Sequence, residues 1–311
     1  MIVRALLSVA VAVVALAATG CGTRGQDLAA GQQPPSSGLH VVATTSILGD
    51  IVTNVVGDAA TVEVVLPAGT DPHDFSPSAS QVAMLTEADL VVANGLHLEE
   101  GLIDALDSAQ ADGGRVFEMA SAFPPQPAAG DHGAGDPHIW FDPPQMAEAV
   151  LALGEELAAV DDAASAEQWR QRAGAYHDAI LATDADIVEL LGGIPEADRT
   201  LVTNHHTLDR FAERYGFEVV GAAIPSTSST AQSSAAELAE LAEVIRQQDV
   251  PAVFSENVSD DSLMRTLAAE AGRDVAVVPM LTDSLAPQGE EGDTYLSMLQ
   301  INARRIAEAL S

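Results

Sequence analysis

Two short segments of the sequence carry the same tripeptide, Asp-Pro-His, followed two residues later by an aromatic residue. They are residues 71–75 (Asp-Pro-His-Asp-Phe) and residues 136–140 (Asp-Pro-His-Ile-Trp), which place His73 and His138 directly after a proline. Proline fixes its own φ and disfavours the helical conformation for the preceding residue, so each histidine is expected in a stiff, extended loop. A rigid loop is suited to holding a metal-binding imidazole. One copy alone would fit an ordinary turn with a surface histidine, whereas the pair favours two metal ligands.

The second half of the chain offers two further candidate positions. Two neighbouring histidines, His205 and His206, follow one predicted strand, and Asp283 follows another. In parallel α/β sheets, ligands bind beyond the carboxyl ends of the strands, which is where these side chains are expected. Glu256 ends a third predicted strand and is a candidate for hydrogen bonding to a ligand side chain or for binding the metal through a water molecule. The residue types leave open which of the two neighbouring histidines would bind.

The elements that must position these side chains alternate between strand and helix. The predicted strands are Leu39–Thr44, Thr61–Leu66, Asp89–Asn94, Arg115–Met119, Leu201–Thr203, Glu218–Ala222, Pro251–Ser255 and Val275–Pro279. The predicted helices are Ile47–Val56 (capped by Ser46), Ser78–Glu87, Leu98–Ser108, Met146–Val160, Ala163–Leu191, Leu208–Tyr215, Ala235–Gln248, Ser262–Ala271 and Tyr295–Leu310. Strands separated by helices of about 10–15 residues imply parallel βαβ units.

The longest helical pattern, Ala163–Leu191, predicts a stiff connection between two such units. Its larger apolar and small residues fall roughly on one stripe, namely Ala164, Trp169, Ala173, Tyr176, Ile180 and Ile187. A helix of that length spans about 40 Å. We therefore predict an α/β fold in which two (β/α) lobes with parallel sheets, residues 39–142 and 194–311, are joined by this one long, rigid helix. The helix lies within a helical region at residues 143–193, and the metal site is expected in the cleft between the lobes.

The N-terminal residues have the features of a targeting segment. Residues 1–20 are predicted to be a signal peptide, because Arg4 precedes an apolar run shorter than the about 20 residues of a membrane span. Residues 18–21 (Ala-Thr-Gly-Cys) are similar to a bacterial lipobox, in which the cysteine is lipidated; the alternative is an unlipidated signal peptide with an incidental cysteine. Cys21 is the sole cysteine, which excludes an internal disulfide and a cysteine-rich metal site. Residues 21–38 are expected to form a flexible tether.

The net charge of the chain limits the classes of partner that it can bind. The formal net charge is −33, and all thirteen basic residues are arginine. Such an acidic surface argues against nucleic acid or anionic lipid as a binding partner and favours cations.

Taken together, the motifs resemble those of the metal-binding lipoproteins of zinc and manganese ABC transporters, the cluster A-I (cluster 9) solute-binding proteins. The resemblance covers essentially all of the mature chain. Its further motifs are residues 94–99 (Asn-Gly-Leu-His-Leu-Glu), 202–205 (Val-Thr-Asn-His) and 282–285 (Thr-Asp-Ser-Leu). It implies two lobes joined by one rigid helix.

The same resemblance implies four metal ligands, which are His73, His138, His205 and Asp283. In the family pattern the third ligand is followed six residues later by Phe, here Phe211, which selects His205 over His206. The family members that take manganese usually carry Glu at that position. Three imidazoles and one carboxylate suit tetrahedral Zn(II), so zinc is the expected cargo and Mn(II) the alternative.

The sequence is less compatible with functions of two other classes. A zinc-dependent hydrolase needs an open coordination position, which Asp283 would close, and no HExxH motif is present. A surface adhesin, a role named for some relatives, would be secondary because the sequence has no adhesive repeats. We therefore expect a non-enzymatic protein that captures metal outside the cytoplasm, is held at the cell membrane by a lipid on Cys21, and passes its cargo to an ABC permease and its ATPase. A monomer is expected.

The other histidines receive weaker roles. The resemblance leaves His97 outside the ligand set, so packing is predicted for it, and His206 is expected to face solvent or to support a ligand. His132 lies in residues 120–135, a Pro-, Ala- and Gly-rich loop that is a candidate lid. His177 is expected to be packed or solvated within a helix, and His40 is left without a role.

Overall fold

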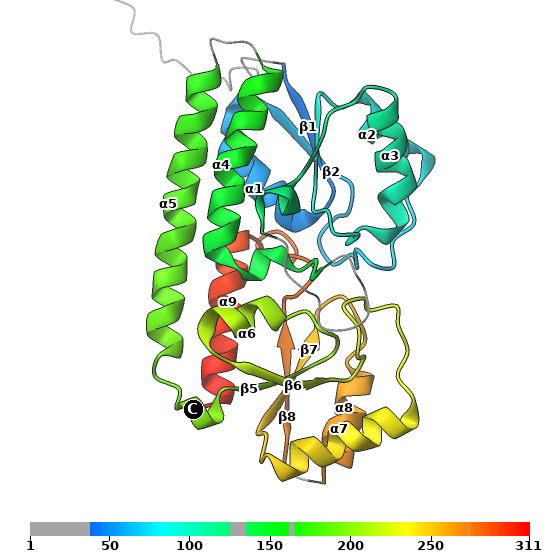
Figure 1. Cartoon of the computed structure of the whole chain (residues 1–311), viewed down its shortest axis with the longest axis vertical. Helices are drawn as coiled ribbons and strands as arrows, with labels where there is room; N and C mark the ends of the chain where they lie inside the picture. Colours follow the sequence, from blue (N-terminus) through cyan, green and yellow to red (C-terminus); the bar gives the residue numbers. More distant parts are fainter. Residues whose placement is uncertain (1–37, 125–134, 162–164, 273) are drawn as a thin grey trace, which may run out of the picture. The chain divides into compact units, whose positions relative to one another are not determined.

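A computed structural model describes residues 38–124, 135–161, 165–272 and 274–311 (Figure 1). The predicted signal peptide, Cys21, nearly all of the predicted tether and His132 lie outside the described residues. Those that are described belong to one compact unit.

The first half of the chain forms a parallel four-stranded sheet. Its strands are β1 (His40–Ala43), β2 (Thr61–Val64), β3 (Leu90–Ala93) and β4 (Val116–Glu118), in the spatial order β2-β1-β3-β4. The helices of this half are α1 (Ser46–Val56), α2 (Ala79–Glu87) and α3 (Ile103–Ala111). Strand β3 is buried along its whole length, as expected of a strand covered on both faces.

The second half repeats the arrangement. Its strands are β5 (Thr200–Thr203), β6 (Glu218–Ala222), β7 (Ala252–Glu256) and β8 (Ala276–Met280), in the order β6-β5-β7-β8. The helices are α6 (Asp209–Tyr215), α7 (Ala235–Gln247), α8 (Ser262–Glu270) and α9 (Tyr295–Ala309). Two parallel sheets with surrounding helices confirm the predicted α/β class.

Two long helices link the halves in sequence. Helix α4 (Pro143–Val160) and helix α5 (Ala166–Leu191) pack against each other along their length, and α5 also contacts α1 and α9 (Figure 1). The predicted stripe of α5 is buried at Trp169, Ala173, Tyr176, Ile180 and Ile187, whereas Ala164 lies outside the described residues. The long helix is therefore braced by three others rather than standing alone.

The hydrophobic core is shared by the two sheets. One cluster of buried side chains contains Val41 from β1, Leu153 from α4, Leu201 from β5 and Ile306 from α9. Two smaller clusters cover the remaining faces, one in each half. The elements that carry the candidate metal ligands are thus anchored in a common apolar interior.

Two local predictions were wrong. The cap of α1 is Thr45, whose hydroxyl accepts the Leu48 N–H at 3.2 Å, rather than Ser46. The helix predicted at 98–108 begins as a short 3-10 turn at Glu100–Leu102 and becomes α3 only at Ile103. The delay follows from the preceding backbone, because Leu96 and His97 have positive φ values of 55° and 61°, which a right-handed helix cannot contain.

Among the residues that the structure describes, none of the helices combines the length and the apolar composition that crossing a bilayer requires.

Candidate metal centre

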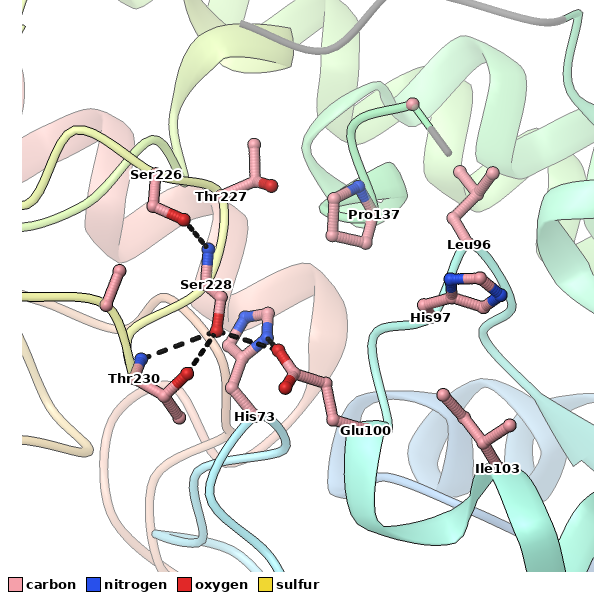
Figure 2. Close-up of a pocket in the computed structure, with 12 residues that line it drawn as sticks. His73, Leu96, His97, Glu100, Ile103, Pro137, Ser226, Thr227, Ser228 and Thr230 are labelled. Carbon is pink, nitrogen blue, oxygen red and sulfur yellow. Dashed lines mark hydrogen bonds and ion pairs between the residues drawn. The ribbon is translucent and has the colours of Figure 1, made fainter. Parts of the chain in front are cut away.

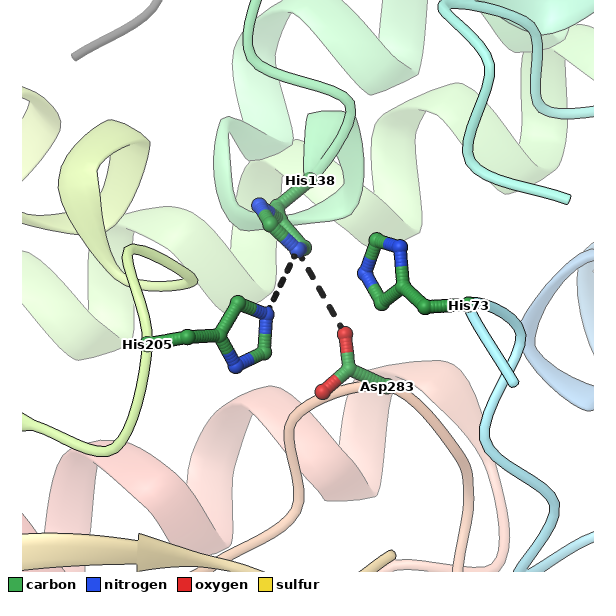
Figure 3. Close-up of side chains that lie close together, drawn as sticks. All are labelled: His73, His138, His205 and Asp283. Atoms are coloured by element: carbon green, nitrogen blue, oxygen red, sulfur yellow. Dashed lines mark hydrogen bonds and ion pairs between the residues drawn. The ribbon is translucent and has the colours of Figure 1, made fainter. Parts of the chain in front are cut away.

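The structure brings the four predicted ligand side chains together. His73, His138, His205 and Asp283 each offer one ligand atom, and these atoms all lie within 4.8 Å of one another (Figure 3). His73 lies on the loop after β2, His138 directly before a 3-10 turn at Ile139–Phe141, and the other two on the loops after β5 and β8. All four residues are buried.

The inward-facing atoms form a set that suits a cation. His138 Nε2 lies 3.1 Å from His205 Nε2 and 3.5 Å from Asp283 Oδ1. Among the described atoms, both ring nitrogens of His73 and both carboxylate oxygens of Asp283 are buried and lack a hydrogen-bond partner. Leaving buried polar atoms unpaired is costly, and a divalent cation bound by nitrogen and oxygen would satisfy them.

Two buried carboxylates face the outer nitrogens of two of the imidazoles. Asp136 Oδ1 lies 2.7 Å from His138 Nδ1, and Glu256 Oε1 is hydrogen-bonded to His205 Nδ1. With Nδ1–H donated to a carboxylate, the Nε2 lone pair of each ring is directed to the centre, which is the arrangement of a metal-bound histidine. Glu256 was predicted as a supporting residue, and its contact with His205 fits that role.

The tripeptide Asp-Pro-His has a local structural cause. Asp71 Oδ1 accepts the His73 N–H at 2.9 Å, and Asp136 Oδ1 accepts the His138 N–H at 3.0 Å. An Asp side chain that accepts the backbone N–H two residues on forms an Asx turn, and the proline between them stiffens it. Each histidine therefore lies in a loop whose conformation is set by the Asp and Pro that precede it.

The electrostatics of the centre follow from burial and these pairs. Burial raises the pKa of Asp136, but its hydrogen bond to His138 and the charges of His138 and Arg210 outweigh burial, so the pKa lies below its usual value. The pKa of Glu256 is likewise lowered, because the charge and hydrogen bond of His205 outweigh its burial. For His205, burial disfavours the charged ring while Glu256 favours it, and the balance raises the pKa to about 9.

Arg210 and Trp140 contact the loops that carry the candidate ligands, and neither role was predicted from the sequence. The Arg210 guanidinium donates from Nε to the Asp136 carbonyl oxygen at 3.1 Å and so links α6 to the His138 loop. The Trp140 ring lies 5.5 Å from the His138 ring, and its Nε1–H donates to the Thr282 carbonyl oxygen at 2.9 Å. The only sequence signal was the aromatic two residues after each histidine.

The remaining histidines lie elsewhere. His206 Nδ1 lies 2.9 Å from Asp209 Oδ2, outside the four-residue cluster. His40 pairs with Glu63, and His177 pairs with Asp178 on the surface of α5. The packing role predicted for His97 was wrong, because this residue is exposed and lines a cavity. Its φ is 61°.

Comparisons with known proteins agree with this architecture. The family model described as "Zinc-uptake complex component A periplasmic" matches residues 41–309. The chain is 30% identical over 305 residues to the manganese-binding lipoprotein MntA of Halalkalibacterium halodurans, covering 98% of both chains. It is 29% identical to the manganese ABC transporter substrate-binding lipoprotein PsaA of Streptococcus pneumoniae, covering 89% of this chain and 90% of the relative.

A solved structure is similar over nearly the same extent. The periplasmic zinc-binding protein TroA from Treponema pallidum superposes with a TM-score of 0.81 at 28% identity, covering 88% of this chain and 99% of that one.

Proposed function

The chain belongs to the family described as zinc-uptake complex component A, and from that membership we propose that it captures Zn(II) through His73, His138, His205 and Asp283. It is a metal-binding component of an ABC importer and not an enzyme. Its relatives carry names for zinc and for manganese alike, so membership fixes a divalent metal as the cargo, and the choice of zinc needs a separate argument.

That argument is the donor set. Three imidazoles and one carboxylate converge within 4.8 Å, and two of the imidazoles are oriented by buried carboxylates. Nitrogen-rich, four-coordinate sites suit Zn(II), whereas Mn(II) favours more oxygen ligands and six-fold geometry. Asp283 supplies the only carboxylate among the four, so the site lacks the oxygen-rich shell that would favour manganese.

Delivery and anchoring complete the proposal. The cargo would pass to an ABC permease with its ATPase, as the names of the relatives imply for those proteins. A lipid on Cys21 would hold the protein on the outer side of the cell membrane, and the support for this is the lipobox-like run at residues 18–21.

A direct competition tests the choice of metal. Metal-free mature protein, prepared by chelator treatment and desalting, is dialysed against equal concentrations of Zn(II) and Mn(II) and then analysed for both elements. We expect one zinc per chain and little manganese. Equal or tighter binding of manganese would remove the zinc proposal and leave the family membership intact.

A further inference from the structure

A cavity of about 510 Å³ lies beside the metal centre (Figure 2). His97 and Glu100 line one side of it, and Ser226, Ser228 and Thr230 line the other. Among the described residues on its wall, His73 is the one that also belongs to the four-residue cluster. The cavity therefore approaches the buried centre on the side of His73.

Glu100 lies on the wall of this cavity next to His73. Its Oε1 lies 3.7 Å from His73 Nδ1 and accepts a hydrogen bond from the Ser228 hydroxyl at 2.7 Å (Figure 2). Its side chain is 45% exposed, whereas the carboxylates facing His138 and His205 are almost fully buried. Glu100 thus reaches both solvent and a candidate ligand.

The separation of 3.7 Å suits a shared cation better than a direct hydrogen bond. Hydrogen bonds between nitrogen and oxygen are shorter than this, at about 2.7–3.2 Å. Zinc bonds to His nitrogen and to carboxylate oxygen are each about 2.1 Å long. One zinc ion can therefore bind both atoms when the distance between them is somewhat shorter than about 4.2 Å, the sum of the two bond lengths.

His97 adds an imidazole to the same wall. It is exposed, and its φ of 61° belongs to a run of three left-handed residues that begins at Gly95. Residues other than glycine occupy that conformation infrequently, and such positions concentrate at functional sites. The backbone here presents an imidazole to the cavity that Glu100 also lines.

We propose that this cavity is the entrance to the metal centre, and that Glu100, assisted by His97, forms a transient first site from which an incoming divalent cation passes to His73. The inference rests on the proposed function, because it requires the buried centre to hold metal. A first site lowers the barrier for loading and, by the same path, for release. Its removal should therefore slow both steps and leave the equilibrium affinity unchanged.

Stopped-flow measurements on the mature chain test this with Zn(II), using a zinc-sensitive dye for association and a chelator for dissociation. In Glu100→Gln we expect both rate constants to fall together by about tenfold, the lower end of what a charged cleft contributes to capture of an opposite charge. The matched control is Glu87→Gln, an exposed carboxylate at the end of α2 that lines none of the described cavities and should leave both rates unchanged.

A second variant tests His97. Asn tolerates the left-handed conformation, so His97→Asn removes the imidazole with little strain, and we expect a smaller parallel slowing of both rates. Unchanged rates in Glu100→Gln would overturn the proposal. A weaker affinity caused by faster release alone would also overturn it, because that result identifies Glu100 as a residue that only orients His73. Failure of the unmodified chain to bind one zinc would instead overturn the proposed function.

Discussion

The two Asp-Pro-His tripeptides have the same backbone hydrogen bond but different surroundings. Asp136 accepts the backbone N–H of its own histidine and also faces the ring nitrogen at 2.7 Å. Asp71 accepts the corresponding N–H, while its second oxygen accepts the Ser229 hydroxyl at 2.7 Å. The orientation of the His138 ring is therefore fixed within its own tripeptide. The ring nitrogens of His73 have no hydrogen-bond partner among the described atoms, and the second oxygen of its Asp bonds to the other half of the chain instead.

Adjacent histidines provide a sharp test of the ligand set. His205→Ala should weaken zinc binding by more than the roughly 10- to 100-fold that loss of an outer hydrogen-bond partner costs, because a ligand itself is removed. His206→Ala is the matched control and should have little effect, since His206 pairs with Asp209 outside the cluster. Isothermal titration with a competing chelator measures both. The reverse order of effects would mean that His206 is the ligand.

The pH dependence of binding follows from the state of the free imidazoles. Metal requires a neutral ring, and in the free protein Glu256 raises the pKa of His205 to about 9. A proton therefore competes with metal below about pH 9, so affinity falls as the pH is lowered through that value. Ordinary imidazoles titrate near 6.5, so with three histidine ligands the slope of log affinity against pH should exceed one between about pH 7 and pH 5.

Chelator competition at a series of pH values measures that slope. Glu256→Gln provides the control, because removing the charge that raises the His205 pKa should move the upper part of the profile to lower pH. A flat profile between pH 7 and pH 5 would show that histidines do not hold the metal.

At the scale of elements, most helices and strands could be predicted from the sequence to within a few residues. Periodicity suffices for an element such as β6, whose predicted and observed bounds coincide at Glu218–Ala222. It fails at residues 95–97, because the apolar pattern does not show that these three residues have positive φ values, which delay the start of α3. It also cannot choose between neighbouring hydroxyls, and so it assigned the cap of α1 to Ser46 instead of Thr45.

The candidate centre could be predicted only in part. The four proposed ligands carry motifs or follow strands, which local sequence reveals. Asp136 lies within the His138 tripeptide, and Glu256 was a candidate because it ends a strand. The sequence does not reveal which side chains they meet, because Arg210 reaches Asp136 across 74 residues and Glu256 reaches His205 across 51. The cavity at Glu100 and Ser228 likewise exists only once the two halves meet, since 128 residues separate that pair.

The contact between α5 and α6 should contribute to stability without contributing to binding. Asp184 on α5 is buried, and its Oδ1 accepts from Arg214 Nε at 2.9 Å and from the Tyr215 hydroxyl at 3.0 Å. We expect Asp184→Asn to lower the free energy of unfolding by about 1–3 kcal/mol, the cost of disrupting a buried charged hydrogen-bond network. Urea denaturation measures this. Asp186→Asn, on the exposed side of the same helix, should be nearly neutral, and zinc affinity should be unchanged in both.

For the whole molecule, the formal charge of −33 opposes direct binding to anionic lipid, and we therefore expect membrane attachment to require the proposed lipid on Cys21. A single acyl chain anchors only marginally, so we expect more than one acyl chain at this cysteine. Cys21→Ser should therefore yield an unprocessed precursor or a freely soluble protein, which membrane fractionation detects. Ser36→Ala, in the tether, is the control and should fractionate like the unmodified chain. Unchanged membrane retention and processing of Cys21→Ser would argue against lipidation.

The position of Trp140 gives the molecule a built-in optical reporter. The chain has two tryptophans. The Trp140 ring lies edge-on against the His138 ring, and its indole N–H donates a hydrogen bond to the carbonyl oxygen of Thr282, the residue before Asp283. The other, Trp169, is buried where α5 packs and donates to Asp161 at 3.0 Å. Indole emission responds to nearby charge, so a cation arriving at His138 should shift the emission of Trp140 and leave that of Trp169 unaltered. Occupancy of the centre can thus be followed by light, without a label, in the protein as it occurs.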